Sequence, residues 1–321
     1  MNQLIKATAL ILLSLSLIAC EDSQPQNMGS ILSTERQTDE ETQTDKAQFT
    51  TVVKGIDITF PADHQAHPDF RHEWWYLTAN LTDEEGHSLG VQWTQFRFAT
   101  APQESDHSTQ KTTWQSQQIY MAHSAVTTKD KHYANEKWSR GQAKLAGVDS
   151  SPFRVYLDDW QWTSATDDLF PATLNADSGQ FGYSLKLTND APYQKQGDQG
   201  YSTKSGDAKV ASYYYSQPFI DVSGKVIING VAHQVSGKGW IDREWISQFL
   251  LDSQQGWDWF VFNLDDGTAL SINRYRHNQQ LPYVFGTLAT RSGKVYHLTD
   301  SDISIKPLQN TTLLNGRRMP L

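Results

Sequence analysis

The stretch from His72 to Leu81, with the sequence HEWWYLTANL, constrains the fold more than any other part of the chain. In a β-strand, successive side chains point to opposite faces of the sheet. The two faces would carry His72, Trp74 and Tyr76 on one side, and Glu73, Trp75 and Leu77 on the other. Both sets are rich in side chains that are usually buried, whereas a sheet with one face in water shows polar residues there. The stretch therefore predicts a strand between the interior of a barrel and something packed outside it.

Turn signals elsewhere favour antiparallel sheet. Asn229-Gly230 separates the alternating segments 225–228 and 231–235, and this dipeptide is a strong hairpin signal. Asp265-Asp266-Gly267 separates residues 257–264 from 268–275 in the same way, with Gly267 free to take a positive φ. Further strands are expected over residues 52–60, 88–98, 119–127, 153–162, 181–188 and 284–290. Because long helical periodicity is nearly absent, we predict an all-β protein, and closure into barrels would remove exposed edges.

The N-terminus has the features of a bacterial lipoprotein signal. Residues 1–20 combine a positive charge at Lys6, an apolar run and small residues before Cys20, the only cysteine of the chain. The run is too short for a permanent transmembrane helix, so we predict a signal peptide with acylation at Cys20. A plain secretory signal is the alternative. The mature protein would face the periplasm of the bacterial envelope, anchored in the inner or outer membrane by its acyl chains.

Residues 21–50 predict a flexible tether. They consist mainly of polar and acidic residues with few large apolar ones, and cannot bury enough surface to offset chain entropy. About 270 residues then remain, which exceeds what one hydrophobic core usually serves, so we expect two domains. With Cys20 acylated, the mature chain would hold no thiol for a disulfide, a nucleophile or a metal site.

Composition narrows the class of partner. The net charge of −9 and the absence of basic runs argue against nucleic acid or an anionic membrane surface. The 11 Trp, 13 Tyr and 13 Phe favour large β surfaces or apolar ligands. The predicted partners are therefore an apolar or lipid-like small molecule and, through the lipid anchor, the membrane.

Several long strings resemble one family, the AttH/CrtC family of lipocalin-like envelope proteins related to carotenoid 1,2-hydratases. They occur in order from about residue 50 to the end: HEWWYLTANL, QWTQFRFA at 92–99, MAHSAVT at 121–127, SYYYSQP at 212–218, GKGWIDREWISQ at 237–248 and GWDWFVFNLDDGTAL at 256–270. The resemblance implies two successive lipocalin-like antiparallel β-barrel domains, over residues 51–236 and 237–321. Residues 315–321 resemble the start of a further family segment, so we expect the second barrel to be truncated. Members are often called secreted hydrolases and are often found with ABC-transporter components.

The candidate chemistry centres on the string Trp240-Ile241-Asp242-Arg243-Glu244-Trp245. Strand alternation places Trp240, Asp242 and Glu244 on one face. Two carboxyl groups that share a partly dry cavity would leave one protonated near neutral pH, as hydration or hydrolysis requires. In the hydratases that this string resembles, the residue matching Asp242 is the proposed proton donor to a carbon–carbon double bond. The alternative is that Asp242, Arg243 and Glu244 form structural ion pairs.

Two histidines are further candidates. His72 is a candidate general base or ligand-orienting group, and His123 in MAHSAVT a candidate ligand-binding residue. A buried histidine bonded to a backbone carbonyl is the alternative for both. No HExxH or HxH spacing occurs, so we expect no metal and no cofactor.

Aromatic residues are the remaining candidates for ligand binding. Pro218 is expected to end the strand that holds Tyr213 and Tyr215, which would leave both tyrosines at a rim. We predict that they line an opening together with Trp74, Tyr76 and Trp240. Sheet packing is the alternative for the two tyrosines. Where this chain has Tyr213 and Tyr215 the hydratases have histidine and tryptophan, which puts the hydratase reaction itself in question. Without a GxSxG motif, hydrolysis would depend on water activation by Asp242 or Glu244.

The sequence therefore supports two functions. The favoured one is an envelope lipoprotein that binds an apolar or amphipathic small molecule, associated with an ABC transporter. The alternative is a hydratase or hydrolase that uses Asp242 as its acid and base.

Overall fold

The computed structural model describes residues 48–102, 116–248, 250–313, 316 and 318–320. The predicted signal peptide, Cys20 and most of the predicted tether lie outside these residues. The described part of the chain is all-β, with one short 3-10 helix, η1 (Ala62–His64). No helix within it has both the length and the apolar character that a bilayer crossing requires.

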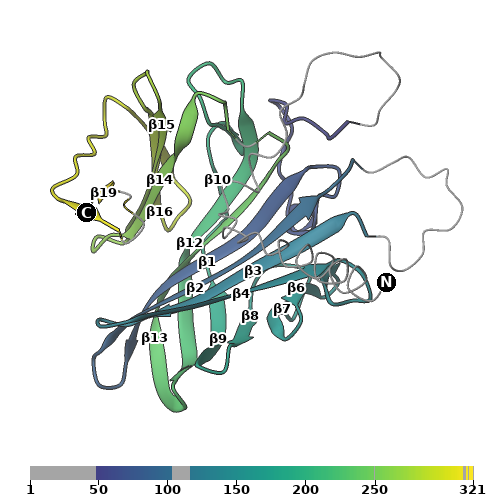
Figure 1. Ribbon diagram of the computed structural model, residues 1–321, viewed down its shortest axis with the longest axis vertical. Coiled ribbons are helices and arrows are strands. Elements are labelled where there is room, and N and C mark those ends of the chain that lie inside the picture. The colour runs from purple at the N-terminus through teal and green to yellow at the C-terminus, as the bar shows by residue number, and fades with distance from the viewer. Residues whose placement is uncertain (1–47, 103–115, 249, 314–315, 317, 321) are drawn as a thin grey trace, which may run out of the picture. The chain divides into compact units, whose positions relative to one another are not determined.

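Most strands belong to a single antiparallel sheet of 13 strands (Figure 1). Eleven of them follow one path, in the order β4-β3-β2-β1-β13-β12-β9-β8-β7-β6-β5, and β10 and β11 pair with β12. Their bounds are β1 (His72–Asp83), β2 (Ser88–Ala99), β3 (Gln118–Thr127), β4 (His132–Arg140), β5 (Ala146–Ser150), β6 (Phe153–Leu157), β7 (Trp160–Ser164), β8 (Ala172–Asp177), β9 (Phe181–Asn189), β10 (Gln194–Lys195), β11 (Tyr201–Thr203), β12 (Ala211–Ile228) and β13 (Val231–Ile246).

This sheet curls into a nearly closed barrel. Strands β2, β3 and β4 contact β6 across the interior, and the Gln95 amide donates a 3.0 Å hydrogen bond to the Tyr156 carbonyl. The interior is filled by aromatic and aliphatic side chains, with Trp75, Trp93 and Trp162 almost completely buried. The barrel is therefore a packed core around which the strands are wrapped.

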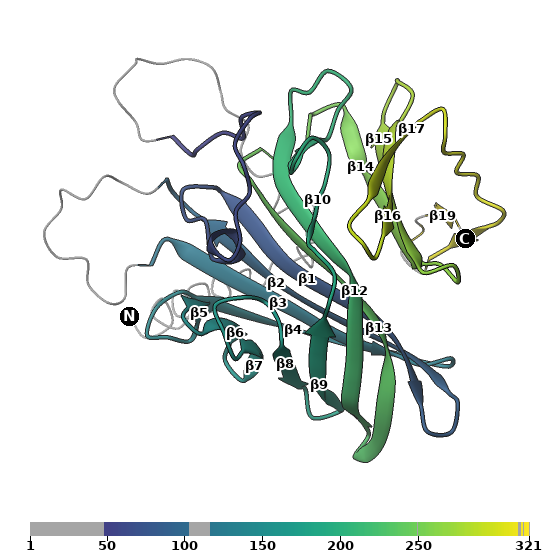
Figure 2. The ribbon, with the colours of Figure 1, turned by 180° about the vertical axis from the view of Figure 1, so that it is seen from behind.

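The strands that follow β13 form a separate four-stranded antiparallel sheet in the order β14-β15-β16-β17 (Figure 2). Its strands are β14 (Gln254–Asn263), β15 (Thr268–His277), β16 (Tyr283–Thr290) and β17 (Val295–Thr299), and a small pair follows, β18 (Asn310–Thr312) with β19 (Arg318–Pro320). Of the two expected barrels, the second of them truncated, the described residues form one nearly closed barrel, and the region expected to hold the truncated barrel forms the small four-stranded sheet. Strand β13 also continues across the boundary predicted between residues 236 and 237.

Both predicted hairpins form. Asn229 and Gly230 connect β12 to β13 with φ values of 50° and 82°, and Gly267 lies in the turn from β14 to β15 with φ 81°. The predicted strand over residues 52–60 is wrong, because Gly55 at φ 92° takes the backbone out of the extended conformation. The predicted strand over residues 153–162 is divided into β6 and β7 by a turn in which Asp158 has φ 58°.

The small sheet packs against the outside of the barrel. Trp259 and Val261 of β14 pack on Trp240 of β13 and Phe219 of β12. The amide of Asn263 donates a 2.8 Å hydrogen bond to the Pro218 carbonyl. Strands β1, β12 and β13 consequently have the barrel interior on one side, while their other face is the one that carries the contacts to the small sheet.

Candidate functional site

Strand β13 separates two chemically different environments. It lies between β1 and β12, where Asp242 is paired with Tyr76 on one side and Ser216 on the other. Trp240, Asp242 and Glu244 lie on the outer face, the face directed away from the barrel interior. Ile241 and Trp245 belong to the barrel core. The alternation predicted from the sequence therefore holds along this strand.

The Asp242 carboxyl group is buried on the outer face and surrounded by neutral hydrogen-bond donors. The hydroxyls of Tyr214 and Ser216 donate to Oδ1 at 2.8 Å and 2.5 Å, and the Trp240 indole donates at 2.9 Å. Burial raises the pKa of Asp242 to about 6; these hydrogen bonds oppose the shift, and the nearby Glu244 adds to it. The group can thus gain and lose a proton near neutral pH. The three hydrogen bonds all reach Oδ1, so Oδ2 is the oxygen suited to carry that proton.

Glu244, two residues further along β13, is paired with a cation instead. Its carboxylate forms a salt bridge with Lys204, whose ammonium group also lies 5.0 Å from the centre of the Tyr214 ring. Burial by itself would lower the pKa of Lys204, but the charge of Glu244 outweighs it, with help from Tyr275, and the pKa is raised. Glu244 is therefore held as part of an ion pair. Lys204 and Tyr214 are not among the residues predicted from the sequence. Nothing in the loop that holds Lys204 indicates where it folds, and the alternation of β12 alone does not say that Tyr214, rather than its two neighbours, faces outward.

Tyr76 and Trp74 share the outer face with the two carboxyl groups, because Tyr76 pairs with Asp242 and Trp74 with Glu244. The Tyr76 ring meets Trp259 of the small sheet edge-on, with 5.3 Å between the ring centres. Burial and the charge of Asp242 raise the pKa of Tyr76 to about 12, so its phenol stays protonated. The structure thus brings together five predicted residues on the outer face: Trp74, Tyr76, Trp240, Asp242 and Glu244.

His72 lies on the same strand but away from this group. It pairs with Ile246, four residues along β1 from Tyr76, which corresponds to roughly 13 Å. Burial, together with the charges of Arg71 and Arg97, lowers the pKa of His72 to about 3. The imidazole is therefore neutral, and so weak a base fits the general-base role poorly.

The inner face of the same strands holds a second buried carboxylate, that of Glu73. It forms salt bridges with Arg97 and Arg243 and accepts backbone hydrogen bonds of 3.0 Å and 3.1 Å from the amide of His67. Burial would raise the pKa of Glu73, but the two guanidinium groups outweigh it and hold the pKa well below its usual range. This cluster is fully charged and has no exposed surface at Glu73. It locks β1, β2 and β13 together from inside.

Tyr213 and Tyr215 belong to this inner face, which corrects the expectation that they line an opening. Pro218 does not end their strand, because a bulge between Gln217 and Ile220 lets β12 continue to Ile228. Tyr215 packs in the core and lies 2.6 Å from Nδ1 of the buried His64. The hydroxyl of Tyr213 donates a 2.9 Å hydrogen bond to the carbonyl of Val53. The tyrosine that reaches the outer face is Tyr214.

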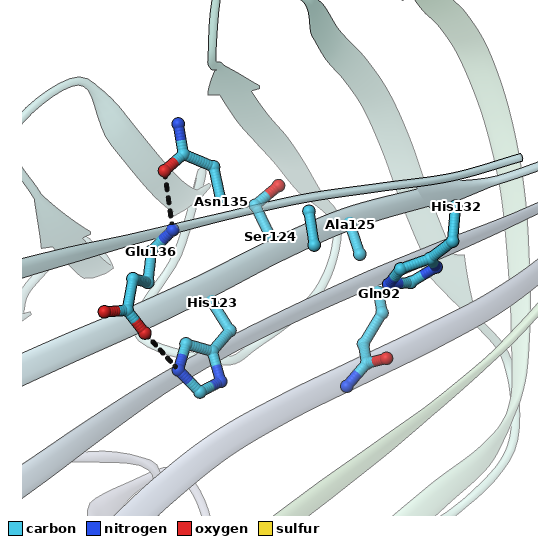
Figure 3. A pocket seen from close by; sticks show the side chains of 8 residues that line it. Gln92, His123, Ser124, Ala125, His132, Asn135 and Glu136 are labelled. Carbon is cyan, nitrogen blue, oxygen red and sulfur yellow. Dashed lines mark hydrogen bonds and ion pairs between the residues drawn. The ribbon is translucent and has the colours of Figure 1, made fainter. Parts of the chain in front are cut away.

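His123 lies at a hollow on the outer face of β2, β3 and β4 (Figure 3). The hollow has a volume of about 420 Å³ and is lined by Gln92, His123, Ser124, Ala125, His132, Ala134, Asn135 and Glu136. Nε2 of His123 is 3.4 Å from the Glu136 carboxylate, and His132 is 2.8 Å from the Thr127 hydroxyl. In the described part of the chain no three His, Cys, Asp or Glu side chains are grouped so that they could hold a metal ion.

The fold and this geometry define a class: an antiparallel β-barrel protein with a titratable acid on its outer face, next to an accessory sheet. The chain belongs to the AttH-like family, whose sequence model matches residues 51–321. The crystal structure of a protein assigned to AttH from Nitrosomonas europaea is similar, with 32% identity, a TM-score of 0.74 and coverage of 85% of this chain and 82% of that one.

A more distant structure shares the fold alone. Kievitone hydratase from Nectria haematococca has 10% identity and a TM-score of 0.62, with coverage of 86% of this chain and 78% of that one. No protein with a curated description matches the chain.

Proposed function

We propose that the protein is an acid–base enzyme that adds water to a carbon–carbon double bond, with Asp242 as the proton donor. The observation that carries the proposal is the Asp242 carboxyl group, buried among neutral donors with its pKa raised to about 6. A carboxylic acid with a pKa near the working pH is suited to give a proton and take one back. Glu73 could not do this, because it is held ionised between two arginines.

The proposed reaction needs only one acid and a water molecule. Asp242 gives its proton to one alkene carbon, and the π electrons form the new C–H bond. The cation left on the other carbon is attacked by water, which forms the C–O bond. The water then loses a proton to the Asp242 carboxylate, so the product is the alcohol and the enzyme is regenerated.

Aromatic rings supply what a transient cation needs. Trp240 donates its indole hydrogen bond to Asp242, and Tyr76 occupies the paired position on β1. Their ring faces can stabilise positive charge by about 1–2 kcal/mol each when water is excluded. The same acid could instead protonate the leaving group of a hydrolysed bond, which is the hydrolase variant of this proposal.

Kievitone hydratase, whose name records a hydratase, has a similar fold, but a shared fold does not by itself imply a shared reaction. The proposal for this chain is therefore based on the geometry at Asp242, because a likeness at 10% identity shows a shared fold and nothing more.

The test is to incubate the protein with hydroxystyrenes and allylphenols in water labelled with heavy oxygen. Addition of one labelled water to an intact substrate supports a hydratase. Cleavage of an aryl ester probe into two fragments, only one of which carries the labelled oxygen, supports a hydrolase. Asp242→Asn should lower turnover by about 10²–10⁴-fold, the usual contribution of a general acid. Glu85→Gln, which neutralises an exposed carboxylate in the turn between β1 and β2, is the matched control. Unchanged turnover in Asp242→Asn would overturn the proposal.

A binding protein without catalysis is the second candidate, and the half-buried aromatics of the outer face favour it. Trp74 and Phe96 lie with 6.3 Å between their ring centres, and Tyr76 lies on the same face. An apolar or amphipathic molecule would lie on this face, since the barrel interior is filled. Binding that survives in Asp242→Asn, together with no turnover in either protein, is the result that favours this candidate.

We also propose that the protein is a lipoprotein of the bacterial envelope, acylated at Cys20 and able to associate with ABC-transporter components. The sequence of residues 1–20 supports this. Metabolic labelling with an alkyne fatty acid should mark the wild-type chain and not Cys20→Ala. Crosslinking in intact cells tests the transporter association.

A further inference from the structure

The hollow at His123 lies on the same line of side chains as Asp242. Across the sheet, Glu136 pairs with His123, His123 with Thr94, Thr94 with Tyr76, and Tyr76 with Asp242. Paired residues of neighbouring antiparallel strands share a face. From β3 to β13 this line crosses three strand spacings, which amounts to roughly 14 Å. One end of the line is open to water and the other is the buried acid.

The hollow exists because small residues oppose each other in the sheet. Ala125 of β3 pairs with Ala134 of β4, and their methyl groups leave space between longer neighbours. His123 and Glu136 lie at one end of the hollow, and Gln92 and His132 at the other (Figure 3). These side chains offer both hydrogen-bond donors and acceptors.

The charge of the lining selects the kind of group that fits. No lysine or arginine is among the residues that line the hollow, and Glu136 places a carboxylate beside it. A carboxylate or phosphate would meet negative charge there without a counter-charge. Nε2 of His123 already contacts the Glu136 carboxylate at 3.4 Å, and this contact reduces the attraction of the carboxylate for a cation. Neutral hydroxyl groups can use the donors and acceptors without either penalty.

An apolar path runs beside this line toward Asp242. Phe96 meets the His123 ring edge-on at 5.8 Å between ring centres and lies at 6.3 Å from Trp74. Both aromatic side chains are half-buried, so part of each ring surface remains accessible. Trp74 is paired in turn with Glu244, which lies two residues from Asp242 on the same face of β13.

We propose that this hollow binds the hydroxylated, uncharged end of an elongated substrate whose apolar body lies along Phe96 and Trp74, so that its far end reaches Asp242. This inference rests on the proposed function and names the substrate class of that site: neutral molecules with a polar hydroxylated end and an apolar tail. The length of the substrate and the polarity of its end would then decide which molecules bind, because the site lies on the outer face and not in a cavity inside the barrel.

The test is calorimetric binding of hexylresorcinol, whose two hydroxyls and alkyl tail match this description, to the whole protein. Ala134→Phe fills the hollow at an exposed position and should weaken binding at least about tenfold. His123→Ala removes one hydrogen-bonding side chain and should weaken it about fivefold. Ser184→Phe, an equally large change at an exposed position of β9, is the matched control and should stay within about twofold.

Two further probes test the charge argument. The 4-hexylbenzoate anion carries a negative end on the same hexyl tail, and the 4-hexylbenzylammonium cation carries a positive end. Each should bind at least about tenfold more weakly than hexylresorcinol. Tighter binding of either charged probe, or equal binding by Ala134→Phe and Ser184→Phe, would overturn the inference.

The binding site and the proposed reaction can fail independently in these experiments. Calorimetry needs no turnover, so weakened binding in Ala134→Phe combined with unchanged turnover in Asp242→Asn would sink the proposed reaction and leave the binding site. Weakened turnover in Asp242→Asn with equal binding by both phenylalanine variants would do the reverse.

Discussion

Glu73 and Asp242 are both buried carboxyl groups on neighbouring strands, yet their pKa values move in opposite directions. Glu73 on the inner face is surrounded by two guanidinium groups, and its pKa is well below the usual range. Asp242 on the outer face has three neutral donors and no salt bridge among those described, and its pKa rises to about 6. Burial penalises the charged form in both places, so the neighbours decide the outcome.

The difference separates structure from chemistry on one strand. A carboxylate that cannot be protonated near neutral pH serves as a fixed charge, and its removal should affect stability. A carboxyl group that changes its protonation state near neutral pH is suited to catalysis, and burying it ionised costs stability. Substitutions at the two carboxyl groups and at their partners test this contrast.

The largest effect on stability should come from Glu73→Gln. This change leaves the two arginines buried in the barrel without their shared carboxylate, and should lower the free energy of unfolding by about 3–5 kcal/mol. Urea denaturation at neutral pH measures it. The triple variant with Glu73→Leu, Arg97→Met and Arg243→Met should recover much of the loss, since no unpaired charge remains. A loss under about 1 kcal/mol in the single variant would refute the cluster's structural role.

Lys204→Met should follow, with a loss of about 3 kcal/mol, because it leaves the Glu244 carboxylate buried without its cation. Adding Glu244→Gln to the same chain should restore most of the stability. If the double variant is as unstable as Lys204→Met alone, the loss comes from packing around the lysine stem and not from the unpaired charge.

The stability contributions of Asp242 and Glu73 should change with pH in opposite directions. Because the folded pKa of Asp242, about 6, is above its ordinary value of 3.8, its favourable contribution is complete below about pH 4 and is lost as pH rises through 6. Wild type should therefore lose about 3 kcal/mol relative to Asp242→Asn over that interval. Glu73 has a lowered pKa, so its contribution is present above its ordinary pKa of 4.5 and is lost as pH falls. Differences from wild type in Asp242→Asn and Glu73→Gln should thus slope in opposite directions with pH, and parallel slopes would contradict the assignment.

The smallest effect should come from Lys238→Ala, which removes an ion pair with Asp221 on the barrel surface. Both side chains of this pair are about half exposed. The free energy of unfolding should change by less than about 1 kcal/mol, in contrast to the loss expected for the buried lysine at position 204. Thermal and urea denaturation of the two lysine variants side by side make the comparison, and an equal loss in both would contradict it.

The alternation of β1 and β13 could be predicted from sequence because it depends only on strand geometry. That argument placed Trp74 and Tyr76 on one face and Glu73 and Trp75 on the other, with both faces covered. It could not say which face is the barrel interior, because each carries aromatic and ionisable residues. The rim position expected for Tyr213 and Tyr215 is wrong for another reason: it depends on Pro218 ending the strand, and the bulge between Gln217 and Ile220 lets the strand continue.

Other parts of the site had no signal in the sequence. Lys204 lies in a loop, and its contact with Glu244 spans 40 residues of chain. The hollow at His123 depends on Ala125 and Ala134 becoming neighbours, which requires the register between β3 and β4. Pro218 is expected to end a strand because it has no backbone N–H group. The strand continues because the bulge between Gln217 and Ile220 places Pro218 where the ladder needs no donor. Pairing and register are tertiary properties, and one strand at a time does not reveal them.

The two faces of β13 also have a consequence for how the chain folds. If this strand slipped by one residue against β1, Asp242 would enter the barrel beside Trp75, and Arg243 would turn toward the small sheet. Glu73 would then lose one of its two cations, and Lys204 would face Arg243 in place of Glu244. Because charges of opposite sign alternate at successive positions of β13, a misaligned pairing of this strand would be less stable than the native one during folding.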